Sequence, residues 1–430
     1  MISYDNAIDE LKIASTRGSK LGLERMKLLM KLLGNPQDKL KVIHVAGTNG
    51  KGSFCAMLGS VMACAGYKVG VFSSPYMLSP DDSYKINGVV VSKEQFAKTF
   101  DEIVAVSEKM DDKPTEFEML AAASYLMFYN AGCDYAIIEC GMGGDGDATN
   151  VVDKPLLSVI TNVAFDHCAF LGSTITEIAT HKAGVIKKDC PVLFGGDDKQ
   201  AEQIVKTVAL ENNAQLYYPE TNEITVKKSG LNGSVVSYKE LDDLSISLSG
   251  VYQIKNLGNL LKAVEILRDN GVKIGNTALR KGLADCRWIG RFEVLNDSPV
   301  IVFDGAHNED GMKDACESIK RYFPNQKVAL LIGTLADKNY KSYVKMLAGL
   351  ISGVFTVSPA NHRALDSKTL AECFEVAGVL AKPYDSVDDG FNAAYSYAKE
   401  NDMPLLVLGS LYMYKDILNA VDRIKQDKNA

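Results

Sequence analysis

The feature that most constrains the fold is a short apolar run followed at once by a Gly-rich turn and a helical segment. The run is Lys41-Val42-Ile43-His44-Val45-Ala46, the turn is Gly47-Thr48-Asn49-Gly50-Lys51-Gly52-Ser53, and Ser53 to Ala65 has helical spacing. Glycines let backbone N–H groups converge on phosphate oxygens, and a helix N-terminus adds partial positive charge. We therefore expect an α/β fold built around a phosphate-binding loop.

The loop departs from the standard G-x-x-x-x-G-K-[ST] pattern, because Gly52 separates Lys51 from Ser53. Both side chains can still reach phosphate and Mg²⁺. An ordinary Gly-rich turn is the alternative interpretation. The order of strand, loop, lysine, serine and helix favours phosphate binding.

Further β-rich runs alternate with helical patterns, which is typical of parallel sheets covered by helices on both faces. In the first half of the chain, strands are expected at Lys68 to Ser73, Asp134 to Glu139, Leu156 to Val163 and Pro191 to Phe194. Ligands of such sheets bind beyond the carboxyl ends of the strands. Polar residues after these strands are therefore candidates for a site.

The pattern changes to period-two alternation between Gln215 and Gly250, which predicts a small antiparallel addition to the first domain. The polar stretch Asn296-Asp297-Ser298-Pro299 is the predicted linker, and a second alternation of strands and helices follows it. We expect a doubly wound, P-loop ATPase-like domain over residues 1–295 and a smaller Rossmann-like α/β domain over residues 299–430.

Composition narrows the function classes. The chain has 47 basic and 54 acidic residues and a formal charge of −7, which argues against a broad nucleic-acid surface. Its nine cysteines include no C-x-x-C pair and read as thiols of a reducing compartment. No signal peptide and no apolar stretch of membrane-spanning length is present, so we expect a cytoplasmic protein that binds neither nucleic acid nor membrane.

Four residues at predicted element ends carry possible chemistry. Glu139 ends a buried strand, where a carboxylate can hold a nucleotide's Mg²⁺ or pair with a lysine, and His167 can complete an oxygen-rich metal shell or be structural. Lys182 ends the helix Thr174 to Lys182, which by itself predicts a solvated lysine favoured by the helix dipole. Asp304 ends the first strand of the second domain, at a position for ligand binding or for a helix cap.

Together these segments resemble the folylpolyglutamate synthase/dihydrofolate synthase branch of the Mur ligase superfamily, nearly end to end. The segments that carry the resemblance are Leu21 to Arg25, His44 to Ser53, Ser73 to Pro75, Asp147 to Asn150, Ile160 to Asn162, Asp166-His167, Lys182 to Gly184, Gln253 with Asn256, Trp288 to Glu293, Asp304 to Asn308 and Gly409 to Tyr412.

The resemblance implies roles for individual residues. Asn49, Gly50, Lys51, Gly52 and Ser53 would hold the ATP phosphates, and Asn256, Arg291 and Asp304 would contact the nucleotide. Mg²⁺, with two ions expected, would be bound by Ser74, Glu139, His167 and Lys182. Lys182 would be carbamylated by CO₂, and Lys51, Lys182 and His167 would be the catalytic residues.

The resemblance also implies the reaction, in which ATP activates a carboxylate as an acyl phosphate and the amine of L-glutamate displaces phosphate. The expected substrates are ATP, L-glutamate and a reduced folate, with dihydropteroate as a possible second acceptor, and the expected state is a monomer. A Mur-type ligase acting on another carboxylate and a non-catalytic nucleotide switch are the alternatives. Residues 1–40 are too few for the extra domain of peptidoglycan ligases.

Two departures from the family pattern bear on the acceptor. The chain has Asp145-Gly146 where the family often has an arginine, and Asp82-Ser83-Tyr84 where it often has E-R-I. Acidic groups disfavour an anionic polyglutamate tail but accept hydrogen bonds from pterin N–H donors. We therefore expect a monoglutamyl tetrahydrofolate to be extended, with growth slowing as negative charge accumulates.

Overall fold

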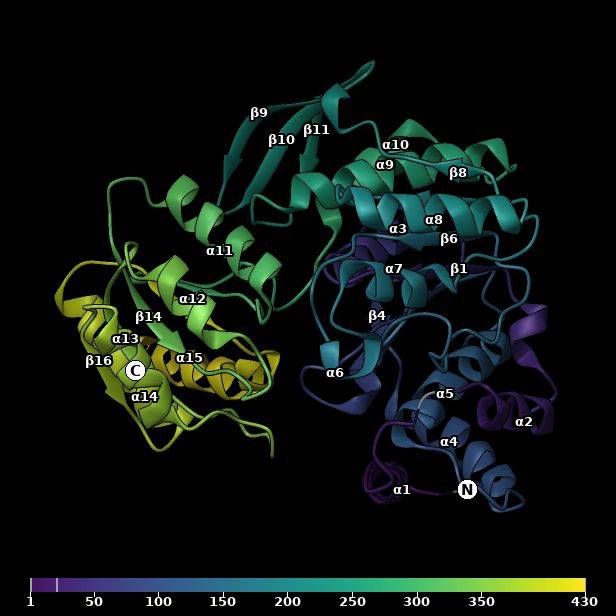
Figure 1. Ribbon diagram of the computed structural model, residues 1–430, viewed down its shortest axis with the longest axis horizontal. Helices are drawn as coiled ribbons and strands as arrows, with labels where there is room; N and C mark the ends of the chain where they lie inside the picture. The colour runs from purple at the N-terminus through teal and green to yellow at the C-terminus, as the bar shows by residue number, and fades with distance from the viewer. Residues whose placement is uncertain (1, 21, 430) are drawn as a thin grey trace. The chain divides into compact units, whose positions relative to one another are not determined.

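The computed structural model describes residues 2–20 and 22–429, and Figure 1 shows its ribbon. Leu21, the first residue of the segment Leu21 to Arg25, lies outside the described residues. The chain forms two compact units. Unit 1 takes in the chain up to Thr225 with Tyr238–Glu240 and Ile254–Cys286, and unit 2 takes in Val226–Ser237, Leu241–Gln253 and the chain from Arg287 onward.

Unit 1 is built on a mixed sheet, whose strand order in the described chain is β4-β3-β2-β5-β1-β6-β7-β8. Strands β2, β5, β1, β6, β7 and β8 run parallel, and the hairpin β3–β4 is antiparallel. The strands are β1 (Val42–Ala46), β2 (Val69–Phe72), β3 (Tyr84–Ile86), β4 (Val89–Val90), β5 (Tyr135–Glu139), β6 (Leu157–Ile160), β7 (Val192–Phe194) and β8 (Leu216–Tyr217).

Helices cover this sheet. They are α1 (Tyr4–Ser15), α2 (Glu24–Leu32), η1 (Pro36–Lys39), α3 (Lys51–Cys64), η2 (Pro80–Ser83), α4 (Lys93–Ser107), α5 (Glu116–Asn130), α6 (Cys168–Leu171), α7 (Ile175–Ala183), α8 (Lys199–Glu211), η3 (Thr221–Glu223), α9 (Gln253–Asp269) and α10 (Asn276–Asp285). Helices α7 and α8 lie side by side (Figure 1).

Unit 2 contains a second sheet, of order β12-β13-β17-β14-β15-β16 in the described residues, with only β12 antiparallel to its neighbour. Its elements are β12 (Glu293–Asp297), β13 (Val300–Phe303), α11 (Glu309–Tyr322), β14 (Val328–Ile332), α12 (Tyr340–Leu347), β15 (Ile351–Thr356), α13 (Ser367–Val376), β16 (Ala381–Pro383), α14 (Val387–Glu400), β17 (Leu405–Leu408), η4 (Leu411–Met413) and α15 (Tyr414–Asn429).

The period-two segment forms a small sheet of its own. Its strands are β9 (Ile224–Gly230), β10 (Gly233–Tyr238) and β11 (Leu241–Ile246), in the order β11-β10-β9. With the two larger sheets, it confirms the predicted α/β class and the predicted small antiparallel sheet. Most of its residues belong to unit 2, so its assignment to the first domain is wrong.

Local sequence explains the elements that position the site. Strand β1 is buried at every residue, as expected for an apolar strand covered on both faces. Helix α7 begins with a capping box, in which the Glu177 amide donates to Thr174 Oγ1 and the Thr174 amide donates to the Glu177 carboxylate. This cap fixes where α7 starts, and so where Lys182 lies near its end.

Two features differ from the expectations. The segment Asn296 to Pro299, predicted as a linker, instead forms the last two residues of β12 and the Ser298-Pro299 turn of the β12–β13 hairpin. The hairpin β3–β4 was not predicted, although its turn residues Asn87 and Gly88 both have positive φ, as a type I′ turn requires. Its strands are too short to show a clear alternation.

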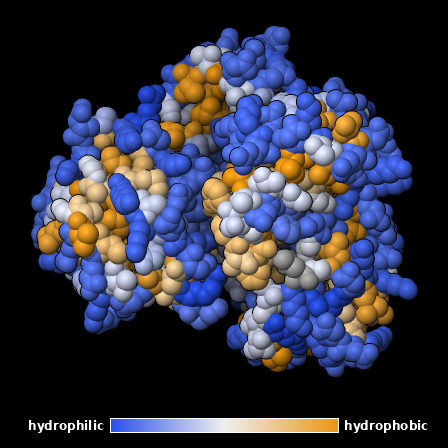
Figure 2. Space-filling view, viewed as in Figure 1, coloured by the Kyte–Doolittle hydropathy of each residue, from blue (hydrophilic) through white to orange (hydrophobic). Residues whose placement is uncertain are grey.

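Figure 2 shows a surface on which polar residues prevail and apolar residues lie in scattered patches. Among the helices described, none combines the length and the apolar character that crossing a membrane requires.

Close packing of α10 on α3 predicts a stability effect. A Cβ at Gly282 would collide with the backbone of Val61, which cannot move aside as a flexible side chain can. We expect Gly282→Ala to lower the free energy of unfolding by ~1–3 kcal/mol, although alanine favours helix by about 1 kcal/mol. Gly349→Ala, with open space around it, is the control in denaturant unfolding. A Gly282→Ala variant as stable as wild type would contradict this packing.

Candidate active site

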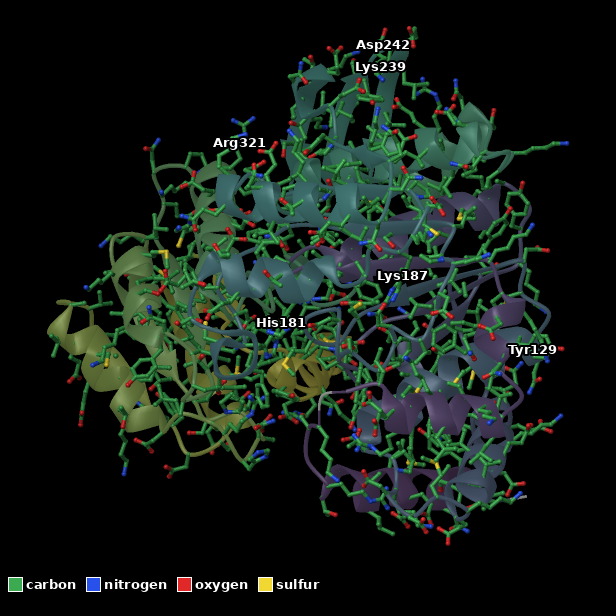
Figure 3. The ribbon with its side chains drawn as sticks, turned by 45° about the vertical axis from the view of Figure 1, so that its right-hand side comes forward. Tyr129, His181, Lys187, Lys239, Asp242 and Arg321 are labelled. Atoms are coloured by element: carbon green, nitrogen blue, oxygen red, sulfur yellow. The ribbon has the colours of Figure 1, made fainter. Side chains whose placement is uncertain are left out.

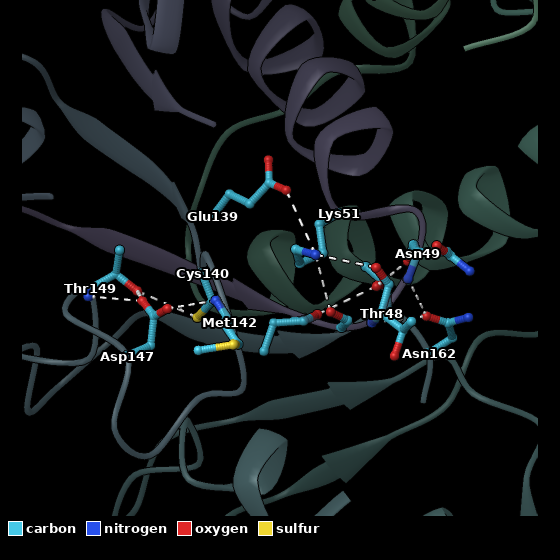
Figure 4. Close-up of polar contacts among 12 residues, drawn as sticks. Thr48, Asn49, Lys51, Glu139, Cys140, Met142, Asp147, Thr149 and Asn162 are labelled. Carbon is cyan, nitrogen blue, oxygen red and sulfur yellow. Dashed lines mark hydrogen bonds and ion pairs between the residues drawn. The ribbon is translucent and has the colours of Figure 1, made fainter. Parts of the chain in front are cut away.

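The phosphate loop is held by the segment that follows β6. Asn162 Oδ1 accepts hydrogen bonds from the amides of Thr48 (3.1 Å) and Asn49 (2.7 Å), as the close-up of Figure 4 shows. Thr161 Oγ1 donates to the carbonyl oxygen of Asn49 at 2.6 Å. The loop is therefore fixed in shape by protein contacts, which leaves the N-terminus of α3 as its anion-binding end.

Two glycines of the loop have no substitute. Gly47 has φ 148° and a Cβ there would collide with the Thr161 side chain. Gly50 has φ 83° and a Cβ there would collide with the Asn256 side chain. Asn256, on the first turn of α9, therefore lies directly against the loop.

Lys51 lies at the first position of α3 and folds back over the loop. Its ammonium group donates to the carbonyl oxygens of Gly47 (3.1 Å) and Thr48 (3.3 Å). The same nitrogen is 3.9 Å from Oε1 of Glu139, the last residue of β5 (Figure 4). Lys51 and Glu139 therefore meet at the loop, where the sequence predicted a phosphate-binding cation and a metal-binding carboxylate.

The Lys182 side chain is buried, with 4% of its surface exposed. Its amine donates to the carbonyl oxygen of Gly47 at 2.9 Å, so Lys182 and Lys51 converge on one carbonyl. Burial, and secondly the nearby Lys51 charge, lower the pKa of Lys182 to about 7. The interpretation of Lys182 as a solvated lysine at a helix end is therefore wrong.

The order of the sheet explains why these residues gather. Strands β2, β5, β1 and β6 are consecutive neighbours and parallel, so their carboxyl ends share one edge. Ser74 follows β2, Glu139 ends β5, the phosphate loop follows β1 and His167 lies beyond β6. Ser74 is half-buried and Glu139 is buried, whereas the His167 side chain is exposed and its backbone has φ 51°.

The donor groups at this sheet edge determine which metal ion it can hold. In the described residues no group of three or more His, Cys, Asp or Glu side chains is arranged to hold a metal ion. A nucleotide-bound Mg²⁺ needs only one or two carboxylates, because phosphates and water supply its other oxygens. Glu139, with Ser74 nearby in the sheet order, fits that requirement.

Arg291 and Asp304 both belong to unit 2. The Asp304 carboxylate is buried and accepts three hydrogen bonds, from the Tyr252 hydroxyl (2.6 Å), the Phe292 amide (2.9 Å) and the Ala306 amide (2.7 Å). Burial raises the pKa of Asp304, while Tyr252 and Arg291 act in the opposite direction. Most acceptor positions of Asp304 are thus taken up by unit 2 itself.

The two acidic residues expected near a pterin are also engaged within the protein. The Asp82 carboxylate accepts hydrogen bonds from the amides of Met77, Leu78 and Ser79. Asp145, half exposed, lies 2.9 Å from Nδ1 of His181. His181 precedes Lys182 on α7 and is labelled in Figure 3. The expectation that Asp82 offers its oxygens to a substrate is therefore weakened.

Sequence reasoning missed three residues that build the site. Thr161 and Asn162 shape the phosphate loop, and Tyr252 donates to Asp304. Thr161 and Asn162 follow a buried strand, so their position was a usable signal. Tyr252 gave no signal, because its contact joins residues 52 positions apart.

Comparisons with known proteins decide the family. The Mur ligase middle domain matches residues 45–264, and the Mur ligase glutamate ligase domain matches residues 290–411. The dihydrofolate synthase/folylpolyglutamate synthase of Bacillus subtilis is 34% identical over 411 residues, which cover 93% of this chain and 95% of that protein. The chain belongs to the folylpolyglutamate synthase/dihydrofolate synthase family. The predicted family and its ATP-dependent glutamate ligase chemistry are thereby confirmed.

Solved structures of the family share the whole fold. The folylpolyglutamate synthase of Mycobacterium tuberculosis, complexed with ADP and AMPPCP, has a TM-score of 0.89 at 25% identity and covers 98% of this chain and 99% of its own. The Escherichia coli FolC protein in complex with DHPP and ADP has a TM-score of 0.86 at 28% identity, covering 99% of this chain and 100% of its own.

The contacts of Asn162 predict a nucleotide-binding effect. Asn162→Ala removes the acceptor of two loop amides, each bond contributing about 1 kcal/mol. We expect KM for ATP to rise about tenfold, which corresponds to ~1.4 kcal/mol, with a smaller change in kcat. Asn270→Ala, which removes only a bond to the Ile266 carbonyl in α9, is the control. An unchanged KM for ATP would show that Asn162 does not shape the nucleotide site.

Proposed function

We propose that this ligase joins L-glutamate to the terminal carboxylate of a reduced folate, and that it also accepts dihydropteroate. The observation that carries the proposal is the convergence of two lysine amines, one of them buried, on the Gly47 carbonyl at the mouth of the phosphate loop. Relatives named for both activities support the two acceptors.

The chemistry requires ATP because a carboxylate oxygen is a poor leaving group. One carboxylate oxygen attacks the γ-phosphorus and the bond between this phosphorus and the β–γ bridging oxygen breaks. ADP departs, and the substrate carboxylate has become an acyl phosphate. The glutamate amine then attacks the acyl carbon, loses a proton, and phosphate departs. Both steps depend mainly on positioning and on stabilising phosphoryl charge.

Residues of the loop supply that stabilisation. Lys51 is placed to turn from the Gly47 and Thr48 carbonyls to a phosphoryl oxygen, and the first amides of α3 to bind the β-phosphate. Asn256 bounds the loop at Gly50. Arg291 would contact the nucleotide. Asp304 fixes the backbone next to Arg291 by accepting a hydrogen bond from the Phe292 amide, and its remaining acceptor position would be open to the nucleotide.

Mg²⁺ would be held by Ser74, Glu139, His167 and a carbamylated Lys182, and when bound it neutralises phosphate charge. The fit depends on Lys182, because an ammonium group repels a cation and a carbamate attracts one. The reaction is addition of the neutral amine to CO₂, which forms an N–C bond and releases one proton. A buried amine whose pKa is lowered to about 7 is neutral often enough at neutral pH to react.

The acceptor preference depends on the loop 141–150. The Asp145 amide donates to the His181 carbonyl at 2.9 Å, so the half-exposed Asp145 carboxylate lies close to the helix end that carries Lys182. An acceptor carboxylate approaching that end meets this negative charge. We therefore retain the expectation that extension slows as glutamates accumulate.

One assay tests the function. Phosphate release from ATP is measured with L-glutamate plus dihydropteroate or mono-, di- or triglutamyl tetrahydrofolate, and without an acceptor. We expect acceptor-dependent release, kcat/KM falling along the glutamate series, and a loss of about a hundredfold or more in kcat for Lys51→Ala. No turnover with any pterin would contradict the proposal, and equal activity in Lys51→Ala would remove Lys51 from the mechanism.

The pKa of Lys182 predicts a dependence on pH and CO₂. Below about pH 7 the amine is increasingly protonated and cannot add to CO₂. When CO₂-depleted enzyme is given the same concentration of dissolved CO₂ at both pH values, the recovery of activity should therefore be faster at pH 8 than at pH 6. Lys182→Ala should lose most activity, and Lys182→Glu should retain more, because a carboxylate keeps the charge of a carbamate. Activity insensitive to bicarbonate at both pH values would argue against carbamylation.

A further inference from the structure

A series of buried, hydrogen-bonded side chains begins on β1, the strand that precedes the phosphate loop, and takes no direct part in the proposed chemistry. His44 on β1 is fully buried, and its Nε2 is 2.9 Å from Thr149 Oγ1 and 3.1 Å from Cys140 Sγ. Thr149 Oγ1 is in turn 2.5 Å from Asp147 Oδ1 (Figure 4). These contacts join strand β1 to the loop 141–150.

The number of available protons fixes the direction of these bonds. The Asp147 carboxylate accepts hydrogen bonds from the amides of Met142 (2.7 Å) and Thr149 (3.0 Å) and from the Thr149 hydroxyl. Burial raises the pKa of Asp147, and these donors act in the opposite direction; three donors on one carboxyl group are the pattern of its ionised form. The single hydroxyl proton of Thr149 therefore points to Asp147. Cys140 Sγ, 3.4 Å from Thr149 Oγ1 and 3.1 Å from His44 Nε2, is a weaker partner of both groups than an oxygen atom. Thr149 Oγ1 therefore accepts from His44, and His44 carries its proton on Nε2.

The opposite arrangement is less favourable. If Thr149 donated to His44, the His44 proton would lie on Nδ1, which is buried without a hydrogen-bond partner. A buried N–H donor without an acceptor is rarer in proteins than a buried acceptor without a donor. Burial, with a smaller effect of Lys187, also lowers the pKa of His44 to about 3, so the imidazole is neutral at neutral pH.

Further hydrogen bonds connect the loop 141–150 with the end of α7, and Lys182 with the phosphate loop. The loop 141–150 contacts the end of α7 through the Asp145 amide to the His181 carbonyl and through Asn150 Nδ2 to the Gly184 carbonyl (3.1 Å). Lys182 lies between these two points and donates to Gly47. Gly47 follows His44 by three residues, so the contacts form a closed ring that begins and ends on the same strand.

We propose that His44 is a positioning residue: its Nε2–H, through Thr149 and Asp147, holds the loop 141–150 and thereby sets the place of the Lys182 amine against the phosphate loop. The proposal rests on the proposed function for its kinetic consequence, because Lys182 is the group that is positioned. Neither His44 nor Thr149 touches a substrate in this account.

The variant that tests these hydrogen bonds is Thr149→Val, which keeps the shape of threonine and removes its hydroxyl group. We expect kcat to fall about 10- to 100-fold, as for residues that orient catalytic groups, with KM for ATP changed less than about threefold. Thr149→Ser restores the hydroxyl group and should recover most of kcat. Thr356→Val, which removes an equally buried hydroxyl bonded to the Ser367 carbonyl in unit 2, is the matched control.

Two measurements test the proposal without ligase activity. Nitrogen-15 NMR of the wild type at pH 7.5 should show His44 as the Nε2–H tautomer. Amide hydrogen exchange should be faster in Thr149→Val than in wild type for peptides that cover residues 141–150 and 181–185, and close to wild type in Thr149→Ser. These measurements remain informative if the wild type proves inactive with folates, which would defeat the proposed function alone.

The Nδ1–H tautomer would overturn the proposal, and so would unchanged exchange in Thr149→Val. Equal losses of kcat in Thr149→Val and Thr149→Ser would also overturn it, because they would reflect packing of the methyl groups rather than the hydrogen bond. If Thr149→Val fails to fold, the tautomer and the behaviour of Thr149→Ser decide the question.

Discussion

Two lysine side chains donate hydrogen bonds to the carbonyl oxygen of Gly47, and the proposed mechanism depends on this contact. Lys51 approaches from the phosphate loop and Lys182 from the end of α7. Two ammonium groups so close repel each other, and water can do little to screen the buried one. Burial in the first place, and this repulsion in the second, lower the pKa of Lys182 to about 7, so that a share of the side chain is a neutral, nucleophilic amine able to become a carbamate.

The scaffold makes this contact possible by joining distant segments at one sheet edge. The order β2-β5-β1-β6 places Ser74, Glu139, the phosphate loop and the residues after β6 at neighbouring strand ends. Asn162 fixes the loop from one side and Asn256 bounds it from another. The ring through His44 and Thr149 holds the loop 141–150, and with it the end of α7. In each case side chains fix the backbone of a loop, and that backbone in turn holds the reacting groups in position.

The parts of the fold and of the site that could be predicted from the sequence are those formed by consecutive residues. The phosphate loop needs only a strand, glycines, a lysine and a helix in order, and Glu139 needs only to end an apolar strand. The environment of Lys182 could not be predicted from its own helix, because its hydrogen-bond partner, Gly47, lies 135 positions away in the sequence. Asp82 and Asp304 looked available from sequence, yet neighbouring amides and a tyrosine occupy most of their acceptor positions. The segment predicted as a linker forms the end of β12 and a hairpin turn, because β12 pairs with β13.

The most direct test of this account is the titration of the Lys182 amine in the CO₂-free protein. NMR of enzyme labelled with carbon-13 at lysine Cε, with Lys182→Arg to assign the resonance, gives the midpoint without any substrate. The account predicts a midpoint near pH 7. A midpoint near 10.5, the ordinary value for lysine, would contradict it, because an amine protonated throughout the neutral range can neither add to CO₂ nor carry the proposed carbamate.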